Sequence, residues 1–457
     1  MTKTTRRSLL IGAGSALTGV VMPAAARAQD MRLADLRGSL DAVDLGMRPG
    51  AGDDQSRALS DILDRASTER KPVFLPPGAY AVSNLNLPEF VHLSGVPGAT
   101  RLVYGGAGHL MMADNAQSIR LSGMTIDGAN RWLDDYAQAT IQISRTGSVV
   151  IEDCDIAGSR KHALMFEACG GSVMNSRISG AALAAIYSVE GLGLRIADND
   201  ILDCANGGIL IHRWTPGYDG SLVTGNRIAR IASQAGGTGQ NGNGINVYRA
   251  DNVLIANNTL TGCAFSAIRS NSGTDIQIVG NQCHDSGETA IYSEFSFQGA
   301  VIANNLVDGA ANGISVANFN EGGRLATING NVIRNLSTEG PYVPDGFGFG
   351  WGIGVEADTA VTGNVIDEAP RAGILMGWGP YLRGVAATGN VVRNSALGVA
   401  VSVVDGVQGI LINNNIFQNT LRGAVVGHRW SERVTGDLTQ EGADAFDELT
   451  VSGNTVV

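Results

Sequence analysis

The stretch Val223-Thr-Gly-Asn226-Arg-Ile228 contains the unit that decides the fold of this chain: an apolar residue, two spacers, an asparagine, one spacer and a second apolar residue. This unit occurs twelve times between Cys154 and Asn454, at steps of 22 to 39 residues. Short recurring steps are typical of solenoids, in which each repeat buries its apolar side only by stacking on its neighbours. We therefore predict a solenoid rather than a single globular core.

Most units carry asparagine at the same place. These asparagines are Asn199, Asn226, Asn258, Asn281, Asn305, Asn331, Asn364, Asn390, Asn415 and Asn454. Cys154 and Ser176 hold the place in the first two units, and Met124 marks a degenerate earlier one. A buried turn must satisfy its polar groups, and an asparagine one coil away can do so. Two short strands flank the asparagine, and a third reads Gly/Ala-Ile-x-Val-x. The pattern predicts an all-β, right-handed, single-stranded parallel β-helix of about 12–13 coils.

Both ends of the chain carry further signals. Arg6-Arg7, a short apolar run and a small-residue cleavage site identify residues 1–28 as a twin-arginine signal peptide, too short for a retained membrane anchor. It predicts export of the folded protein by the twin-arginine machinery to the periplasm or cell exterior. We expect a cap and first coils over residues 29–110, with a capping helix over Asp53–Ala66. Repeats follow over 111–457, with loop insertions near 233–243 and 337–350. Either residues 431–448 or another copy of the chain would cover the C-terminal end, so an oligomer through that end is one option.

Composition restricts the classes of function. The formal net charge is −11, and removal of residues 1–28, which hold four basic residues and no acid, makes it −15. Such a chain does not suit general nucleic-acid binding, which needs a basic surface. Among five cysteines, Cys204 and Cys263 occupy one repeat position two coils apart, about 9.6 Å at a strand spacing of about 4.8 Å. A disulfide does not reach that far, so we expect both to fill the apolar interior.

The expected helix, the segment Phe74-Leu-Pro-Pro-Gly-Ala-Tyr80 and the asparagine units together resemble the pectate-lyase-like superfamily of right-handed parallel β-helices. With the Arg6-Arg7 leader, the chain is similar to an uncharacterised family of twin-arginine-translocated β-helix-repeat proteins. The resemblance implies the fold and the export route, but no established reaction. In superfamily enzymes such as polygalacturonases, the strand similar to Gly/Ala-Ile-x-Val-x carries the catalytic groups.

Alternation along that strand points every second side chain outward. The outward positions on successive coils are Met165 and Glu167, Tyr187 and Val189, Leu210 and His212, Asn246 and Tyr248, Arg269 and Asn271, and Tyr292 and Glu294. On later coils they are Ser315 and Ala317, Leu375 and Gly377, Ala400 and Ser402, and Val425 and Gly427, with Glu356 as an exception. Reactive side chains are thus concentrated on the earlier coils, where we expect a groove walled by the two insertions.

We predict that this groove processes an acidic polysaccharide by β-elimination or C5 epimerisation. Both reactions remove a proton next to a carboxylate, so they need a base, a proton donor and a group that stabilises the enolate. His212 and Tyr248 suit the first two roles, and Arg269 suits the third. Glu294 completes the candidate catalytic residues. The candidate substrate-binding residues are Lys161, His162, Glu167, Tyr187, Arg213, Trp214, Asn246, Arg249, Asn271 and Tyr292.

Three alternatives stay open. A calcium ion between Glu288, Glu294 and Asn271 would suit the preference of calcium for oxygen ligands, although no binding loop is recognisable; no other cofactor is expected. Glycoside hydrolysis would use paired carboxylates, for which Glu288 and Glu294 are available. Polygalacturonase-like enzymes carry aspartates and a Gly-His-Gly segment here, however, whereas this chain has Lys161-His162-Ala163. The third alternative is a non-catalytic glycan-binding or structural repeat protein.

Overall fold

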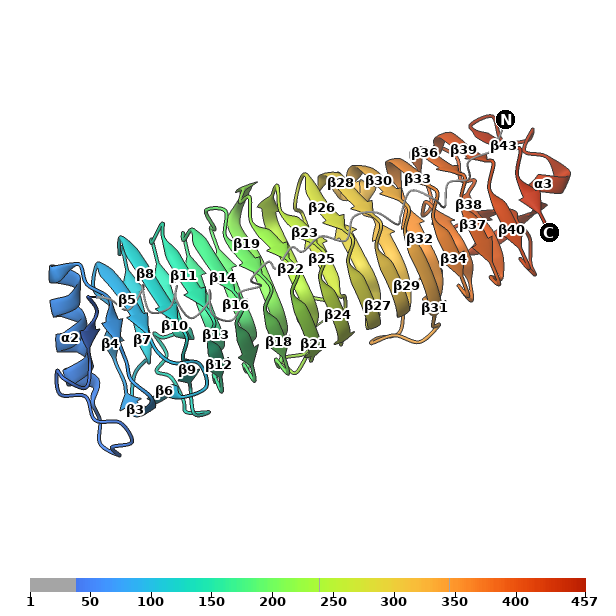
Figure 1. Ribbon diagram of the computed structural model, residues 1–457. Helices are drawn as coiled ribbons and strands as arrows, with labels where there is room; N and C mark the ends of the chain where they lie inside the picture. The colour runs from blue at the N-terminus through green and yellow to red at the C-terminus, as the bar shows by residue number, and fades with distance from the viewer. Residues whose placement is uncertain (1–37, 238, 345) are drawn as a thin grey trace, which may run out of the picture. The chain divides into compact units, whose positions relative to one another are not determined.

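The computed structural model describes residues 38–237, 239–344 and 346–457. Residues 40–457 form one compact unit, a parallel β-helix in which the chain passes through three short strands per turn (Figure 1). It has about 14 turns. The predicted signal peptide lies outside the described residues. Within the described ranges, no helix is long and apolar enough to cross a membrane.

Equivalent strands of successive turns pair in parallel and form three ladders. The first ladder contains β1 (Leu40–Asp41), β2 (Val73–Phe74), β5 (Phe90–Ser94), β8 (Ser118–Ser122), β11 (Val149–Glu152), β14 (Gly171–Met174), β17 (Arg195–Ala197), β20 (Leu222–Thr224), β23 (Leu254–Ala256), β26 (Ile276–Val279), β28 (Gln298–Ala303), β30 (Arg324–Asn329), β33 (Ala357–Thr362), β36 (Arg383–Thr388), β39 (Gln408–Asn413) and β43 (Leu449–Ser452). The second ladder contains β3 (Gly78–Val82), β6 (Thr100–Tyr104), β9 (Thr125–Asp127), β12 (Asp155–Ala157), β15 (Arg177–Ser179), β18 (Asp200–Leu202), β21 (Arg227–Ile231), β24 (Thr259–Cys263), β27 (Gln282–Glu294), β29 (Leu306–Val316), β31 (Val332–Leu336), β34 (Val365–Asp367), β37 (Val391–Arg393), β40 (Ile416–Gln418) and β44 (Thr455–Val456). The third ladder contains β4 (Leu85–Asn86), β7 (Met111–Asp114), β10 (Ala139–Ser144), β13 (His162–Glu167), β16 (Ala184–Val189), β19 (Gly207–Tyr218), β22 (Asn243–Asp251), β25 (Ile268–Asn271), the second halves of β27 and β29, β32 (Trp351–Val355), β35 (Ala372–Met376), β38 (Leu397–Ser402) and β41 (Val425–Arg429).

The asparagines form the predicted ladder between the first and second strands of each turn. Asn281 is typical: its Oδ1 accepts the backbone N–H and the Nδ2–H of Asn258, each at 3.0 Å. Its own Nδ2 donates to Ile255 O and to Asn305 Oδ1, both at 3.0 Å. The same contacts recur from Asn199 to Asn454. Each buried amide thus satisfies the polar groups in the turn of the neighbouring coil, which explains why asparagine recurs at this place.

The solenoid has more turns than the asparagine units alone indicated, because its first turns use a different corner. In these turns β5 ends at Ser94 and β8 at Ser122, and the two hydroxyl oxygens lie 2.9 Å apart. Gly95 and Gly123 follow, and Gly123 has φ +66. These serines lie two residues before the asparagine place, which Met124 occupies after β8, and Met124 is buried in the apolar stack. The turn is therefore invisible to a pattern built on asparagine.

Removal of one interior asparagine should weaken the solenoid measurably. In Asn281→Ala, the two buried donors of Asn258 lose their acceptor, and each unsatisfied group costs about 1–3 kcal/mol. We expect the free energy of unfolding to fall by at least about 2 kcal/mol, measured by urea unfolding followed by circular dichroism. Asn86→Ala, at an exposed position of β4, is the control and should change it by under about 0.5 kcal/mol. Equal midpoints for the two variants would contradict a stabilising ladder.

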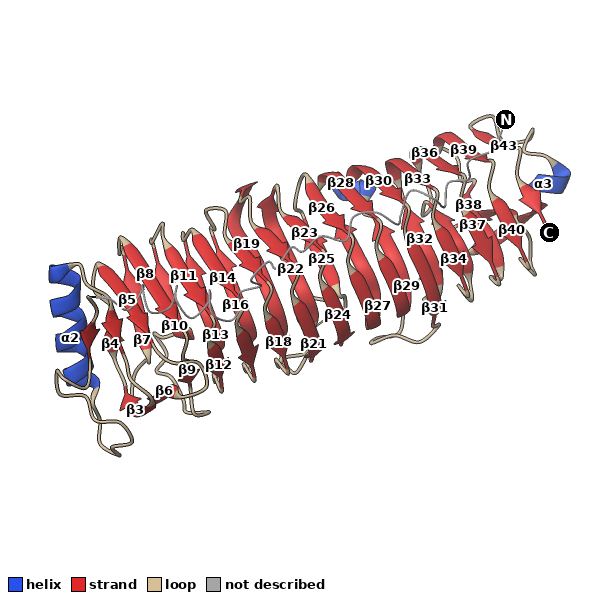
Figure 2. Ribbon diagram, viewed as in Figure 1, coloured by secondary structure: helices blue, strands red, loops and turns tan. Residues whose placement is uncertain are grey.

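The interior is one continuous apolar stack from Ala42 to Leu449. The predicted capping helix is α2 (Ser56–Glu69), which buries Leu59, Ile62, Leu63 and Ala66 and packs on β2, β4 and β5 at the N-terminal end of the stack (Figures 1 and 2). It begins three residues later than predicted, because Asp54 lies before the helix and accepts the N–H of Ser56 at 3.0 Å. All five cysteines are free and buried, as the interior-filler interpretation requires.

Residues 431–448 pack against the last turns. The strand β42 (Glu432–Asp437) pairs antiparallel with β41. The short helix α3 (Leu438–Glu441) follows, and Leu438 and Ala443 are buried in the apolar stack. A further short helix, η1 (Phe319–Glu321), lies outside the ladders (Figure 2). The chain itself therefore covers part of its C-terminal end, the first of the two arrangements considered above.

Candidate functional site

The outward side of the third ladder, here called the third-strand face, carries the residues singled out from the sequence. One outward column contains Met165, Tyr187, Leu210, Asn246, Arg269 and Tyr292. A second column beside it contains Glu167, Val189, His212, Tyr248, Asn271 and Glu294. On these turns the strands have the expected register, so the candidate residues occupy neighbouring strands about 4.8 Å apart.

Four rings make a continuous line of contacts across β13, β16, β19 and β22. The ring centroids of His162 and Tyr187 are 4.9 Å apart, and those of Tyr187 and His212 are 5.3 Å apart. The His212 and Tyr248 centroids follow at 5.6 Å. We call these four residues the ring ladder. The last two pairs meet edge to face, a favoured aromatic geometry, which brings the predicted base and the predicted proton donor into direct contact.

Both histidines of the ring ladder are uncharged at neutral pH. Burial, and secondarily the nearby His162, lower the pKa of His212 to about 4. Burial likewise lowers the pKa of His162 to about 4, and its Nδ1 accepts the N–H of Ala184 at 3.2 Å, which requires an unprotonated nitrogen. The buried Nε2 of His212 has no hydrogen-bond partner among the described residues. Burial, assisted by Glu167, raises the pKa of Tyr187. The neutral imidazoles of His162 and His212 thus flank the protonated phenol of Tyr187, and an unprotonated imidazole is the state that proton abstraction needs.

The buried, neutral state of His212 predicts an effect on acid stability. Its folded-state pKa of about 4 lies below the ordinary 6.5, so between these values the unfolded chain binds a proton that the folded chain does not. This group therefore lowers the free energy of unfolding as the pH falls, by on the order of 3 kcal/mol in total. In His212→Gln the loss between pH 7 and pH 4.5, measured by urea unfolding, should be smaller than in the natural protein. Equal losses would contradict a buried neutral imidazole.

A bulge in β19 adds an aromatic side chain next to the ring ladder. Four residues, Arg213 to Pro216, lie opposite the single residue Arg249 of β22, because His212 pairs with Tyr248 and Gly217 with Ala250. Glu190 holds the bulge: its carboxylate accepts the N–H of Trp214 at 2.7 Å and forms an ion pair with Arg213 at 2.5 Å. Bulges of this kind re-aim side chains and are common beside active sites. The sequence pattern indicated these residues but not the bulge.

Arg249 contacts the aromatic residues of this region. Its guanidinium lies over the ring of Tyr248, 4.8 Å from the centroid, and its Nη1 donates to Trp214 O at 3.1 Å. No carboxylate of the described residues lies within ion-pair distance of it. Trp214 is 60% exposed, so a flat apolar surface, a cation, a phenol and an imidazole meet on two adjacent strands.

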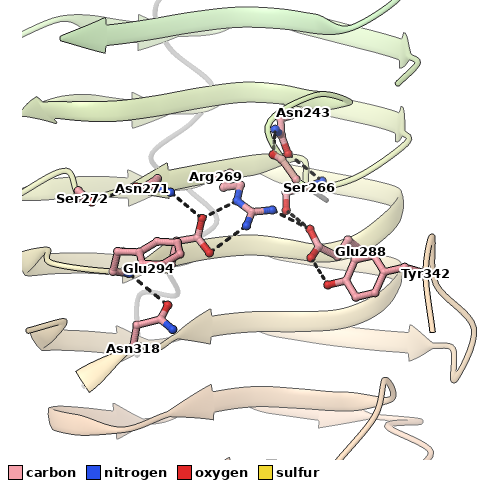
Figure 3. Close-up of polar contacts among 11 residues, drawn as sticks. Asn243, Ser266, Arg269, Asn271, Ser272, Glu288, Glu294, Asn318 and Tyr342 are labelled. Carbon is pink, nitrogen blue, oxygen red and sulfur yellow. Dashed lines mark hydrogen bonds and ion pairs between the residues drawn. The ribbon is translucent and has the colours of Figure 1, made fainter. Parts of the chain in front are cut away.

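Arg269, by contrast, is already neutralised (Figure 3). Its Nε and Nη2 donate to the two carboxylate oxygens of Glu294 at 2.7 and 2.9 Å. Its Nη1 donates to Glu288 at 3.0 Å. The Tyr342 hydroxyl donates to the other oxygen of Glu288 at 2.6 Å. We call these four residues the arginine–glutamate cluster. Arg269 is 9% exposed and each glutamate 2% exposed, so the cluster is part of the packed structure.

The cluster limits what its members can do chemically. All four carboxylate oxygens accept hydrogen bonds, including one from Asn271 to Glu294 at 3.2 Å and one from Ser266 to Glu288 at 3.4 Å. Burial disfavours the charged guanidinium, but the two carboxylates outweigh it and raise the pKa of Arg269. Burial raises the pKa of Glu288, with Arg269 and Tyr342 opposing. The cation between the carboxylates is thus a guanidinium, and the residues do not fit the calcium ion considered above.

Both loop insertions reach the arginine–glutamate cluster. In the first, Gly239 lies against Arg269 so closely that a Cβ there would be 1.9 Å from Nη1, and its backbone has φ +134. In the second, Tyr342 binds Glu288 and packs between Phe265 and Phe349, at ring distances of 6.4 and 5.4 Å. Both insertions therefore contact the cluster, as expected of segments that enter the same face.

Other predicted binding residues have structural partners. The Lys161 ammonium donates to three backbone carbonyls, of Asp134, Asp135 and Ala137, at 3.0, 3.3 and 2.6 Å. Its charge therefore holds a neighbouring loop. Glu167 accepts a long hydrogen bond of 3.5 Å from Ser144.

The remaining binding candidates surround the arginine–glutamate cluster. Asn246 is buried, and Asn271 donates to Glu294 as described above. The Tyr292 ring stacks under Arg269 at 4.9 Å, and burial raises the pKa of Tyr292 above its usual range. The structure thus brings Trp214, Tyr248 and Arg249 together with His212.

The last turns differ from the expected register. Val399 pairs with Val425, and Ser402 pairs with His428, so Val426 and His428 lie in the outward columns rather than Val425 and Gly427. A one-residue shift exchanges the two faces of a strand, and for this reason the sequence pattern missed His428. Glu356, the outward carboxylate of the later turns, accepts the N–H of Phe319 at 2.6 Å. Burial raises its pKa to about 7.

Comparisons with known proteins agree on the architecture. No curated protein sequence matches the chain. Among solved structures, the chain is similar to the N-terminal fragment of gene product 12 of bacteriophage phi29, at 16% identity and a TM-score of 0.51, covering 88% of this chain and 71% of that one. The pre-mature form of that protein is 16% identical at a TM-score of 0.52, and the match covers 93% of this chain and 60% of that one. The A-module of a mannuronan C-5 epimerase from Azotobacter vinelandii is 16% identical at a TM-score of 0.48, and the match covers 92% of this chain and 99% of that one.

These similarities concern the fold alone. The model of the right-handed β-helix region matches residues 109–240 and 217–392, together more than half of the sequence. The chain belongs to the family of proteins built on a right-handed β-helix region.

Proposed function

We propose that the chain acts on an acidic polysaccharide at the third-strand face, with His212, Tyr248, Arg249 and Trp214 as its site. The observation that carries this proposal is the position of Arg249, a cation free of carboxylate partners among the described residues, stacked on Tyr248. Tyr248 in turn contacts the neutral imidazole of His212. We further propose, from the Arg6-Arg7 leader, that the protein works in the periplasm or outside the cell.

The chemistry follows from what each group can do. The guanidinium of Arg249 binds the carboxylate of a uronate unit and stabilises the enolate that forms when the adjacent proton leaves. His212 accepts that C5 proton through Nδ1, since its Nε2 is buried. In β-elimination the C4–O bond then breaks, the leaving oxygen takes a proton from Tyr248, and a C4–C5 double bond remains. In epimerisation the C5 carbon takes a proton back from the opposite side. Trp214 supplies a flat surface for stacking of a sugar ring.

This assignment moves the carboxylate-binding role from Arg269 to Arg249. Arg269 already binds two carboxylates with three of its nitrogens, so a third carboxylate would compete with them. The same contacts argue against glycoside hydrolysis by Glu288 and Glu294, because a general acid must turn a protonated oxygen toward the glycosidic bond. Both carboxylates of the pair predicted for hydrolysis, Glu288 and Glu294, already accept hydrogen bonds from residues of the protein.

A panel of uronate polymers tests the proposal. The mature protein is incubated separately with polymers of mannuronate and guluronate, of galacturonate and of glucuronate. A lyase yields ultraviolet-absorbing unsaturated ends, and an epimerase changes the ratio of C5 epimers seen by NMR. Binding by isothermal titration without either product would establish the non-catalytic alternative. Absence of both binding and product across the panel would overturn the proposal.

Substitution of Arg249 tests carboxylate recognition. Arg249→Gln removes a charge-assisted hydrogen bond, worth about 1.5–3 kcal/mol, so we expect KM or Kd for the active polymer to rise about ten- to hundredfold. Arg195→Gln, at an exposed arginine of β17 in the first ladder, has the same change of charge away from the site and should leave both constants within about twofold. An equal effect of the two substitutions would show that only the overall charge matters.

A further inference from the structure

A cavity lies on the last turns, far from the ring ladder. It has a volume of about 510 Å³, and its lining residues come from the second insertion, the starts of β35 and β38, and the β41–β42 hairpin. From β19 to β38 there are seven strand spacings, roughly 34 Å. This cavity is therefore a separate place on the molecule.

Three arginines line this cavity: Arg371, Arg422 and Arg433. None of them forms an ion pair with a described residue, and no described lining residue is acidic. The chain as a whole has a net charge of −11, so a group of unpaired cations in one hollow is a local reversal of its charge. Guanidinium groups in such a group repel one another unless an anion lies between them.

Backbone carbonyls hold two of these guanidiniums in place. Arg371 Nε donates to Phe349 O at 2.6 Å. Arg433 donates through Nε to Thr435 O at 2.9 Å and through Nη1 to Arg422 O at 2.8 Å. These bonds use only part of the donor capacity, since each guanidinium carries five N–H groups. The remaining donors are positioned in advance, which lowers the entropy cost of binding.

One wall of the cavity is apolar. Phe347 lines it and meets the His428 ring edge to face, with centroids 5.4 Å apart. Leu397 lines the same hollow. Burial lowers the pKa of His428, so its imidazole is neutral at pH 7 and belongs to the wall rather than to the cationic group. The cavity combines a planar apolar surface with a cationic side, and its volume is that of an ordinary small-molecule site.

We propose that this cavity binds one acidic sugar unit, whose oxyanion group, a carboxylate or a phosphate, contacts Arg371, Arg422 and Arg433 while its apolar face packs on Phe347. Arginine suits both oxyanions because its planar fork of donors matches two oxygens at once. The inference does not depend on chemistry at His212: a protein without lyase or epimerase activity would keep this site.

Isothermal titration of the full mature chain tests it with four probes: D-glucuronate, glucose 6-phosphate, inorganic phosphate and uncharged glucose. To exclude binding at the other site, the titrations are repeated in Arg249→Gln. We expect at least one of the two acidic sugars to bind in both proteins. Binding of glucuronate would identify a carboxylate as the preferred oxyanion, and binding of glucose 6-phosphate would identify a phosphate. Glucose should not bind, and inorganic phosphate should bind at least about tenfold more weakly than the preferred acidic sugar, because it lacks the apolar contact.

Arg422→Gln is the main variant, because it removes a lining cation whose side chain has no partner among the described residues. We expect Kd for the preferred sugar to rise about ten- to hundredfold, and Arg371→Gln to act in the same direction. Arg429→Gln, an exposed arginine of β41 outside the cavity, should leave Kd within about twofold. Circular dichroism melting verifies folding. No binding of either acidic sugar, binding unchanged in Arg422→Gln, or inorganic phosphate binding as tightly as the sugar would overturn the proposal.

Discussion

The variant His212→Gln should lose between about a hundredfold and ten-thousandfold in kcat on the active polymer, the range that a general base contributes. KM should change much less, because Arg249 and Trp214 still bind the substrate. The natural protein should keep kcat/KM nearly constant down to about pH 4–5, since the pKa of His212 is lowered to about 4 and the imidazole remains a base above that value. A rate assay across pH 3.5 to 8 with both proteins measures these effects.

His284→Gln is the matched control. His284 lies in the first half of β27, in the second ladder, and so away from the third-strand face. We expect its kcat and pH profile to stay within about twofold of the natural protein. If His212→Gln retained turnover within about threefold while Arg249→Gln weakened binding, another group would be the base. The substrate-binding role of Arg249 would then be supported, and His212 would have no role in the reaction.

The variant Arg269→Met should destabilise the solenoid by about 3–5 kcal/mol, the usual cost of removing one partner from a buried ion pair. Glu288 and Glu294 would then be buried without their counter-charge. Loss of the counter-charge would raise the pKa of Glu288 further, so folding of the variant would be coupled to proton uptake. Its stability deficit should therefore shrink as the pH falls toward 4, because protonated carboxyl groups need no counter-charge. Urea unfolding near pH 7 and near pH 4.5 measures both effects.

Arg334→Met provides the comparison. Arg334 and Asp308 form an ion pair at 2.7 Å in which the arginine side chain is 49% exposed, and such pairs contribute roughly 0–1 kcal/mol. A similar small effect for Arg269→Met, or a deficit that does not depend on pH, would show that the arginine–glutamate cluster contributes little to the fold. Loss of turnover with unchanged stability would instead return Arg269 to the catalytic, enolate-stabilising role predicted from the sequence.

Much of the third-strand face could be predicted because the asparagine ladder sets the register of every turn between Cys154 and Asn415. Once Asn226 and Asn258 are aligned, His212 and Tyr248 must pair, and the structure confirms this pairing. The prediction was wrong where spacing changes: on the last turn, Val426 and His428 rather than Val425 and Gly427 occupy the outward columns. The first coils were expected within residues 29–110, but the repeat did not set their register, because these turns lack the asparagine.

The partners of the charged side chains could not be predicted. Arg249 and Arg269 look equivalent in the sequence, each on or beside an outward strand position. In the structure a bulge of four residues leaves Arg249 free beside Trp214, whereas two glutamates and two insertions enclose Arg269. The sequence alone determined the solenoid, the register of most turns and the strands that carry the proposed site, because short local periodicity dictates stacking. Only the tertiary structure decided which cations stay free to bind a ligand, because ion pairs and loop contacts join residues that periodicity does not relate.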